Sequence, residues 1–353
     1  MGIFVNILEL PNFKMNLVSY VLRRLLLALF VVLGVLTFTF ILAHSLGNPI
    51  HAWLGKAAAL HPELVSLYVA KYHLNDPFYV QYYYYVVGLL GGNLGYSPSR
   101  GFEPVIQIIG QTLPNTLQVA IFAIVLTLVL GIVLGIAAAF YHKKPIDVGI
   151  RAFYLAGYSS PPFFVALVLL IVFVYFLHLL PTSGSAAAGL SPPRPITTLP
   201  IVDSLLEGDY TYFWSSLQHV ILPSLALALT TFGIVTRILR SAMLDVMHSN
   251  FIMTARAKGL DERTVFLKHG FRNAMIPVVT ISSLVVTWLL TGTVFVENIF
   301  SYPGMGQYVV QALLAQDYPG VLAVTLIYAI MIVITNLVAD LLYAAFDPQV
   351  RLG

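Results

Sequence analysis

Six long apolar stretches restrict this chain to a helical membrane fold. Each is far longer than a β-strand, and none alternates apolar and polar residues as the strands of a membrane barrel do. A helix needs about 20 mostly apolar residues to span the hydrocarbon of a bilayer. The stretches cover residues 19–43, 113–141, 151–179, 217–241, 275–297 and 320–346. We therefore predict an all-α, polytopic membrane protein with six transmembrane helices.

The composition agrees with a chain that lies in a bilayer. Of its 353 residues, 59% are hydrophobic and only 9% are charged. The surface of a soluble domain must be polar enough to be hydrated. A soluble domain therefore cannot bury so large an apolar area in its interior. The sequence has no cysteine, which excludes disulfides, iron–sulfur clusters and thiol catalysis. Its formal net charge of +3 is too small to indicate a nucleic-acid partner.

The distribution of Lys and Arg predicts the orientation of the helices, because cytoplasmic loops are enriched in basic residues. Most of the 18 basic residues lie at the N-terminal side of the first stretch, between the second and third, between the fourth and fifth, or after the sixth. This pattern places both termini in the cytoplasm, as an extension (1–18) and a tail (347–353). Residues 44–112 and 180–216 then face outward. The first stretch is too long for a cleaved signal peptide, so we expect an uncleaved anchor.

One apolar segment in the large external region is too short to span a bilayer. Residues 78–90 read FYVQYYYYVVGLL and number only 13. Consecutive tyrosines suit a membrane interface better than hydrocarbon. We predict that this segment stays outside and either lies on the membrane or packs on the helical bundle.

A charged segment interrupts the apolar pattern between the fourth and fifth stretches. Residues 253–277, MTARAKGLDERTVFLKHGFRNAMIP, hold seven charged residues. Ser249 or Asn250 can cap a short helix, Gly259 suits the left-handed residue that ends it, and Asp261 can cap a second helix. The predicted order is helix, Gly break, helix, membrane helix. Two interpretations follow: an ordinary basic loop with interfacial helices, or a docking element for a cytoplasmic partner.

The residues of this segment resemble the cytoplasmic signature of ABC importer permeases. TARAKGL (254–260) is followed, eighteen residues after its Gly, by the Pro of RNAMIPV (272–278), a spacing similar to that of the oligopeptide/dipeptide/nickel branch. The leading acidic residue of the family pattern is replaced by Met253, and the usual Gly-Asp-Pro after the first helix is Gly47-Asn48-Pro49. Further similar segments, in the family order, are YVLRRLLLALFVVLGVLTFTFILAHSLGNP (20–49), LNDPFYVQY (74–82), GGNLGYS (91–97), TLPNTLQVA (112–120), SSPPFFVAL (159–167), HVILPSLALAL (219–229), VENIFSYPGMGQYVVQALLAQDYPGV (296–321) and NLVADLLYAAFDPQVRL (336–352).

The resemblance implies a B-type permease subunit with the type I ABC importer permease fold. Its core would cover residues 113–346, with a cytoplasmic docking segment at 242–274 and an external loop at 180–216. The implied ATPase-docking residues are Thr254, Ala255, Arg256, Ala257, Lys258, Gly259, Leu260 and Asp261. The chain has no GxxxxGK[ST] phosphate loop, so we expect a transport subunit and not an enzyme.

The same resemblance implies the partners and the substrate classes. The partners would be a C-type permease subunit, two nucleotide-binding subunits that hold ATP and Mg²⁺, and an external substrate-binding protein. We expect no cofactor in this chain itself. Members of the branch import peptides, oligosaccharides or nickel. The external loop at 181–213 is unusually long, and we hypothesise that it adds contact area for the binding protein.

Candidate residues of the substrate pathway are Ser159, Ser160 and Glu297. Ionisable groups within spans are functional candidates by default, although Glu297, Asn336 and Asp340 could equally bond neighbouring helices. Gly131 and Gly135 form a GxxxG pair that predicts close helix contact, either within this chain or with a second permease subunit.

Three other functions are weighed against the importer. A metal site at His44, His51, His61 and His73 lacks ligand spacing or accompanying carboxylates, so solvated loop histidines are the simpler interpretation. An intramembrane serine protease would need the Ser of TSGS (182–185) beside His178 or His219. A secondary transporter or channel would predict inverted repeats and interrupted helices with charges at the bilayer midplane.

Overall fold

The computed structural model describes residues 17–45, 62–71 and 73–346. The predicted extension at 1–18 lies almost wholly outside the described residues, as do the tail at 347–353 and part of the external region at 44–112. Within the described ranges the chain is predominantly helical, and its one sheet pairs two short strands. The predicted all-α class is therefore confirmed for the described residues apart from this small sheet.

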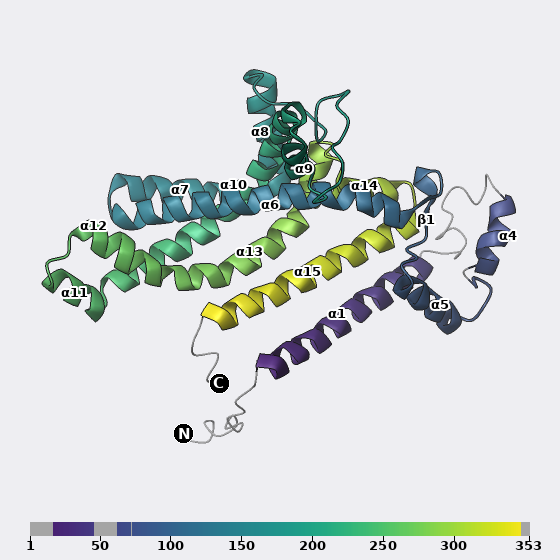
Figure 1. Ribbon diagram of the computed structural model, residues 1–353, viewed down its shortest axis with the longest axis horizontal. Helices are drawn as coiled ribbons and strands as arrows, with labels where there is room; N and C mark the ends of the chain where they lie inside the picture. Colours follow the sequence, from purple (N-terminus) through teal and green to yellow (C-terminus); the bar gives the residue numbers. More distant parts are fainter. Residues whose placement is uncertain (1–16, 46–61, 72, 347–353) are drawn as a thin grey trace.

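Helices α6 and α10 form the centre of the bundle. α6 (Val105–Phe140) is 36 residues long and α10 (Tyr210–Met247) is 38. α13 (Phe271–Ile299) packs on α10, α15 (Tyr318–Phe346) packs on α13, and α1 (Leu17–Ser45) packs on α15 (Figure 1). The elements therefore form a row of helices in which the N-terminal helix lies at one edge.

Close contact between α6 and α10 depends on the predicted GxxxG pair. A Cβ on Gly131 would lie 2.6 Å from the side chain of Val235, and one on Gly135 would lie 3.0 Å from the side chain of Leu239, both on α10. Beside these glycines, the buried hydroxyls of Thr127 and Thr231 lie 2.9 Å apart and share a hydrogen bond between the two helices. The GxxxG pair therefore packs within this chain, which is the first of the two interpretations.

The apolar helices agree with a membrane protein, while the number of crossings stays a prediction. Three described helices are long and apolar enough to span a bilayer: Val105–Phe140, Tyr210–Met247 and Tyr318–Val338. Two bent helix pairs raise that number to five if each pair is one span. The first predicted span contributes the apolar helical segment Leu26–Ile41. Helices thus cover all six predicted stretches.

The third predicted span, 151–179, is not one continuous helix. α7 (Pro145–Ser159) runs back along α6 and α10, and the chain then turns by 109° into the helix made of α8 (Pro162–Leu169) and the π-helical η2 (Leu170–Phe176) (Figure 1). The predicted span is thus helical on both sides of a sharp bend at residues 160–161.

Two consecutive prolines cause this bend. Ser160 has an extended backbone (φ −94°, ψ 133°), as does Pro161 (φ −64°, ψ 145°). A proline disfavours helical dihedrals in the residue before it, so Pro161 excludes Ser160 from a helix and Pro162 excludes Pro161. Pro162 itself occupies the first position of α8, where a missing N–H costs nothing.

Short elements precede α6 at the end of the bundle opposite α11 (Asn250–Ala257) and α12 (Glu262–Thr264) (Figure 1). They are α4 (Pro62–Lys71), α5 (Phe78–Leu90), β1 (Tyr96–Ser97), the 3₁₀ turn η1 (Pro98–Arg100) and β2 (Glu103–Pro104). α5 packs on α1, since the ring of Phe40 lies 5.2 Å from each of the rings of Phe78, Tyr82 and Tyr85. The segment at 78–90 therefore packs on the bundle, one of the two predicted arrangements.

Two further short helices precede long ones. α9 (Pro200–Glu207) leads into α10, and α14 (Met305–Leu314) lies between α13 and α15. Asp317 fixes the start of α15, because its buried carboxylate accepts hydrogen bonds from Ser97, Ser99 and the amide of Gly320. The short sheet before α6 is thereby joined to the C-terminal helix.

Candidate functional site

The charged segment folds as two short helices joined by a glycine turn at one end of the molecule (Figure 1). α11 (Asn250–Ala257) follows α10, and α12 (Glu262–Thr264) continues through the π-helical η3 (Val265–Gly270) into α13. The predicted order of helix, Gly break, helix and membrane helix is confirmed.

Gly259 supplies the turn between the two helices. Its φ of +76° lies in the left-handed region, which side chains disfavour. Nothing lies within 4 Å of the position that a Cβ would occupy, so the requirement for glycine is conformational and not steric. The amide of Gly259 donates to the carbonyl of Arg256 (2.9 Å), closing the end of α11.

Asp261 caps the second helix as predicted. Its carboxylate accepts a hydrogen bond from the amide of Thr264 (3.0 Å). The pKa of this carboxyl is lowered because the hydroxyl and the amide of Thr264 both donate to its ionised form. The cap is thus present above the ordinary pKa of an Asp and is lost as the pH falls through the lowered value. Ser249, by contrast, makes no capping bond, because its hydroxyl donates to the carbonyl of Val246 (2.6 Å).

Apolar side chains anchor the underside of this segment to the bundle. Ile252 and Ala255 of α11 are buried with Val265 of η3, against Val246 and Met247 of α10. Ala255, one of the eight residues predicted for docking, therefore belongs to the anchor and not to the exposed face. The other seven predicted residues are exposed.

A second contact joins the segment to α6. The ring of Phe266 lies 5.3 Å from the ring of Phe140, the last residue of α6, in an edge-to-face arrangement. On the outer side, Arg256 and Glu262 form a two-point ion pair across the glycine turn (2.8 and 3.1 Å). The two helices are thus held to each other and to the ends of α6 and α10.

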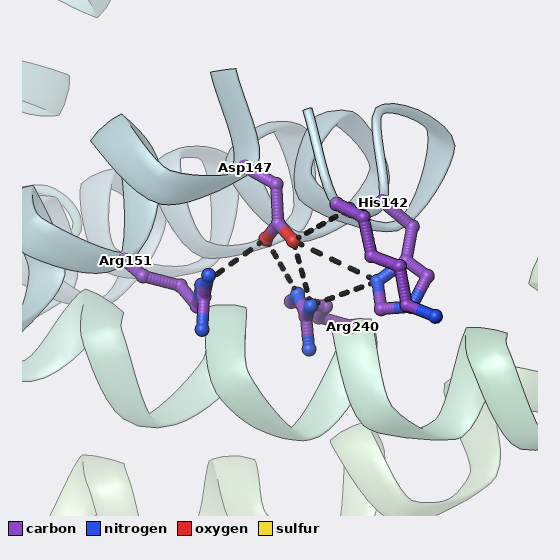
Figure 2. A network of polar contacts seen from close by, with 5 residues as sticks. His142, Asp147, Arg151 and Arg240 are labelled. Carbon is purple, nitrogen blue, oxygen red and sulfur yellow. Dashed lines mark hydrogen bonds and ion pairs between the residues drawn. The ribbon is translucent and has the colours of Figure 1, made fainter. Parts of the chain in front are cut away.

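Near the same end of the molecule, Asp147 forms an ion-pair cluster between α7 and α10 (Figure 2). Its carboxylate is 1% exposed and accepts two hydrogen bonds from the guanidinium of Arg240 (2.7 and 2.8 Å). Arg151 lies 3.5 Å away, one turn along α7, and the amide of Lys143 donates to the same carboxylate (3.1 Å). This cluster fixes the turn between α6 and α7 to α10, and nothing in the sequence pattern alone indicated it.

The predicted pathway residues Ser159, Ser160 and Glu297 are not joined to one another by a hydrogen bond within the described part of the chain. The hydroxyl of Ser160 donates to the carbonyl of Ala156 (2.8 Å), and Ser159 is exposed at the end of α7. The bend that follows lines a cavity of about 580 Å³ with α13, to which Thr287 and Trp288 contribute. These two residues were not singled out in the sequence.

Glu297 is buried and caps the start of α14. One carboxylate oxygen accepts hydrogen bonds from the amides of Gly306 (2.7 Å) and Gln307 (3.2 Å). Asn336 likewise accepts a hydrogen bond from Thr287 of α13 (3.1 Å). Both observations favour the interpretation that these polar groups bond neighbouring elements; the side chain of Asp340 lies outside the described residues.

The metal and protease alternatives gain no support from the described residues. There, no group of three His, Cys, Asp or Glu side chains could hold a metal ion. His73 pairs with Asp76 (2.8 Å) and stacks on Tyr84, whereas His51 and His61, and the side chain of His44, fall outside the described residues.

The two histidines considered for a protease, His178 and His219, lie near Ser183 but are not hydrogen-bonded to it in the described part of the chain. His178, Ser183 and His219 line one cavity of about 700 Å³ at the external loop. The Nδ1 of His219 bonds the carbonyl of Ser215 (2.7 Å), and among the described residues no hydrogen bond joins Ser183 to either histidine. The arrangement required of a nucleophile and its base is therefore not observed.

The external loop is fixed to the bundle by a buried amide that sequence reasoning missed. Gln118 of α6 accepts a hydrogen bond from the amide of Ile201 in α9 (3.0 Å) and donates to the hydroxyl of Tyr302 (2.7 Å) and to Ser216 of α10 (3.3 Å). Asp203 and Ser204 of α9 are also buried. A polar residue inside an apolar stretch was the signal for this role.

These features describe a bundle of long apolar helices with a capped, charged segment at one end, and comparison with known proteins gives its family. Residues 131–352 match the family described as binding-protein-dependent transport system inner membrane component, and the chain belongs to that family. It is therefore a membrane protein, as its apolar helices indicate, and the resemblance inferred from its motifs is confirmed.

Relatives match over almost the whole chain. A probable D,D-dipeptide transport system permease protein of Escherichia coli strain K12 is 37% identical over 92% of this chain and 94% of its own length. A dipeptide transport system permease protein of Alkalihalophilus pseudofirmus is 35% identical over 95% and 100%. An oligopeptide transport system permease protein of Bacillus subtilis is 34% identical over 94% and 99%.

Proposed function

We propose that this chain is the B-type permease subunit of an ATP-driven importer of peptides. The observation that carries the proposal is the capped segment at 250–270, which presents seven exposed predicted docking residues and is anchored to α6 and α10. A basic interfacial loop needs neither the apolar underside nor the ion pair across Gly259. The names of the three relatives above support peptides over oligosaccharides or nickel.

The partners would be those of the family. Two nucleotide-binding subunits, with ATP and Mg²⁺, would bind the exposed face of α11. A C-type permease subunit would complete the pathway, and an external binding protein would deliver the peptide. The lack of a GxxxxGK[ST] motif in this chain agrees with ATP hydrolysis on separate subunits.

The mechanism would be alternating access driven through α11. Closure of the ATPase dimer would move α11, and the buried contacts of Val265 and Phe266 would pass this motion to α10 and α6. Six spans with cytoplasmic termini complete the proposal. The position of α11 and α12 at the end opposite α5 and the short sheet supports this orientation (Figure 1).

The external loop would contribute to binding-protein contact. α9 exposes Val202, Leu205 and Leu206 while Asp203 and Ser204 are buried, so its outward face is apolar up to the exposed Glu207 at its end. Removal of the whole loop would also remove Ile201, whose amide donates to the buried Gln118. Substitution of the exposed leucines by Ser therefore tests the contact more cleanly than deletion does.

Uptake by the assembled importer tests the proposed function. The complex, purified with its ATPase and binding protein and placed in liposomes, should take up labelled peptides only when ATP is supplied, and binding-protein calorimetry should show heat with peptide pools. Heat only with oligosaccharides would contradict the substrate class. Uptake without ATP would support the alternative, an ATP-independent secondary transporter or channel.

A further inference from the structure

A basic cluster surrounds the turn between α6 and α7. Lys143 and Lys144 lie on the turn, and Arg151 and Arg240 converge on the carboxylate of Asp147 (Figure 2). We refer to these four basic residues, with His142, as the inner basic cluster. Asp147 is the only acidic residue in ion-pair contact with them among the described residues. The cluster therefore carries a surplus of positive charge.

The surplus charge is held on three exposed side chains. Asp147 is engaged mainly by Arg240, which is 17% exposed and binds both carboxylate oxygens. Arg151 is 44% exposed, and only its Nε approaches the same carboxylate, at 3.5 Å. Lys143 and Lys144 are exposed and take part in none of the ion pairs of the described residues. The ammonium of Lys144 lies 5.7 Å from the centre of the Tyr141 ring. Asp147 is thus the one carboxylate of the described residues near these three cations, and their exposed charges can attract an anion.

His142 adds an imidazole at the rim of the cluster. Its Nδ1 lies 3.0 Å from a guanidinium nitrogen of Arg240 and 3.6 Å from the carboxylate of Asp147. In the tautomer in which Nδ1 accepts a hydrogen bond from the guanidinium, which has only donors, the ring proton is on Nε2. The exposed Nε2–H can then donate to a further acceptor, such as an oxygen of a phosphate group.

Apolar side chains adjoin Arg151 on one face of α7. Val148 and Leu155 precede and follow Arg151 by three and four residues in α7, so all three share one face. Both apolar side chains are more than half exposed. A cation between exposed apolar groups, on a membrane protein, fits a ligand that has an anionic head and hydrocarbon tails.

We propose that the inner basic cluster binds an anionic phospholipid of the inner leaflet. Its phosphate would lie among Lys143, Lys144 and Arg151, and an acyl chain would lie along Val148 and Leu155. Basic pockets beside membrane helices on the cytoplasmic side bind such headgroups. The inference goes beyond the proposed transport function and rests on its orientation, in which this end faces the cytoplasm.

The chain connects this site to the docking segment. The turn that carries Lys143 and Lys144 follows Phe140, whose ring contacts Phe266 of η3. A bound lipid headgroup would therefore restrain the same end of α6 that supports the docking segment.

Lipid binding to the purified importer tests the site without any transport measurement. Native mass spectrometry of the complex should show retained dioleoyl phosphatidylglycerol and little dioleoyl phosphatidylcholine, which has the same chains and no net charge. Arg151→Gln should weaken phosphatidylglycerol binding about fivefold, and Lys143→Gln with Lys144→Gln more than tenfold, because each basic residue near an anionic lipid contributes about 1 kcal/mol.

Matched variants separate the site from general charge effects. Arg194→Gln removes one exposed basic residue from the external loop and should leave binding unchanged. Lys143→Arg with Lys144→Arg keeps the charge and should retain the lipid. Equal binding of both lipids, or equal loss in Arg194→Gln, would overturn the proposal. Displacement of the lipid by millimolar inorganic phosphate would instead indicate a free-phosphate site, and cross-linking of this turn to the partner permease without retained lipid would indicate a protein interface.

Discussion

Asp147 shows how one buried carboxylate can hold a membrane turn in place. It lies 93 positions from Arg240 in sequence, yet the two side chains make a two-point ion pair between α7 and α10. Removal of one partner from a buried pair leaves the other charge uncompensated, which costs about 3 to 5 kcal/mol. The stability of the turn therefore depends on both partners together.

We expect Asp147→Asn to destabilise the protein by about 3 kcal/mol, the lower end of that range because Arg240 retains some exposure. Arg151→Gln, which removes the exposed partner, should cost less than about 1 kcal/mol. Thermal or denaturant unfolding in detergent measures both. If the double variant Asp147→Asn with Arg240→Gln is no more stable than Asp147→Asn alone, the pair is not coupled as described.

Glu297 gives a second prediction at the residue scale. Glu297→Ala should destabilise by about 1 to 3 kcal/mol, because it leaves the amides of Gly306 and Gln307 without their acceptor in a buried site. Glu297→Gln keeps one acceptor oxygen and should cost less. Peptide uptake by the folded Gln variant should remain. Abolished uptake in a stably folded Glu297→Gln complex would instead favour a place in the substrate pathway.

Among the elements, the docking segment was predictable and the third span was not. Gly259 and Asp261 act locally, so their left-handed turn and helix cap follow from residue type. The bend at Ser160 lies inside an apolar run, and single prolines at 114, 223 and 277 are accommodated within helices. The distinguishing signal was the pair Pro161–Pro162, since each proline excludes its predecessor from the helix.

Gly259→Ala should impair coupling more than it impairs folding. A side chain in the left-handed region costs about 1 to 2 kcal/mol and would tilt α11. Gly92→Ala is the matched control, because Gly92 has a φ of +77° and equally open surroundings. It follows α5, which lies at the other end of the bundle (Figure 1). ATP-driven uptake should fall in the first variant only. Equal uptake in both would contradict the role of the turn.

For the whole molecule, sequence reasoning gave the helical membrane class and the positions of the apolar stretches. It could not give contacts between distant elements. Gln118 and Asp147 both bond residues that only the assembled bundle brings near them. Apolar periodicity specifies which segments leave water, whereas polar partners inside a bundle depend on the relative rotation and depth of its helices.

The lack of cysteine permits a direct test of orientation. Lys258→Cys and Glu207→Cys each place one thiol at an exposed position, in the docking segment and in the external loop. A membrane-impermeant maleimide applied to intact cells should label the Glu207→Cys variant only, and inverted vesicles should reverse the result. The unsubstituted chain is the unlabelled control. Labelling of both variants from one side would contradict the proposed arrangement of the membrane helices.

The bend between α7 and α8 has a mechanical consequence. Pro161 and Pro162 have no N–H to donate, and the carbonyl of Pro161 already accepts from the amides of Phe164 (3.0 Å) and Val165 (3.2 Å) within α8. Each half thus keeps its own ladder of hydrogen bonds whatever the angle between them. A change in the angle between α7 and α8 would therefore break no backbone hydrogen bond inside either helix.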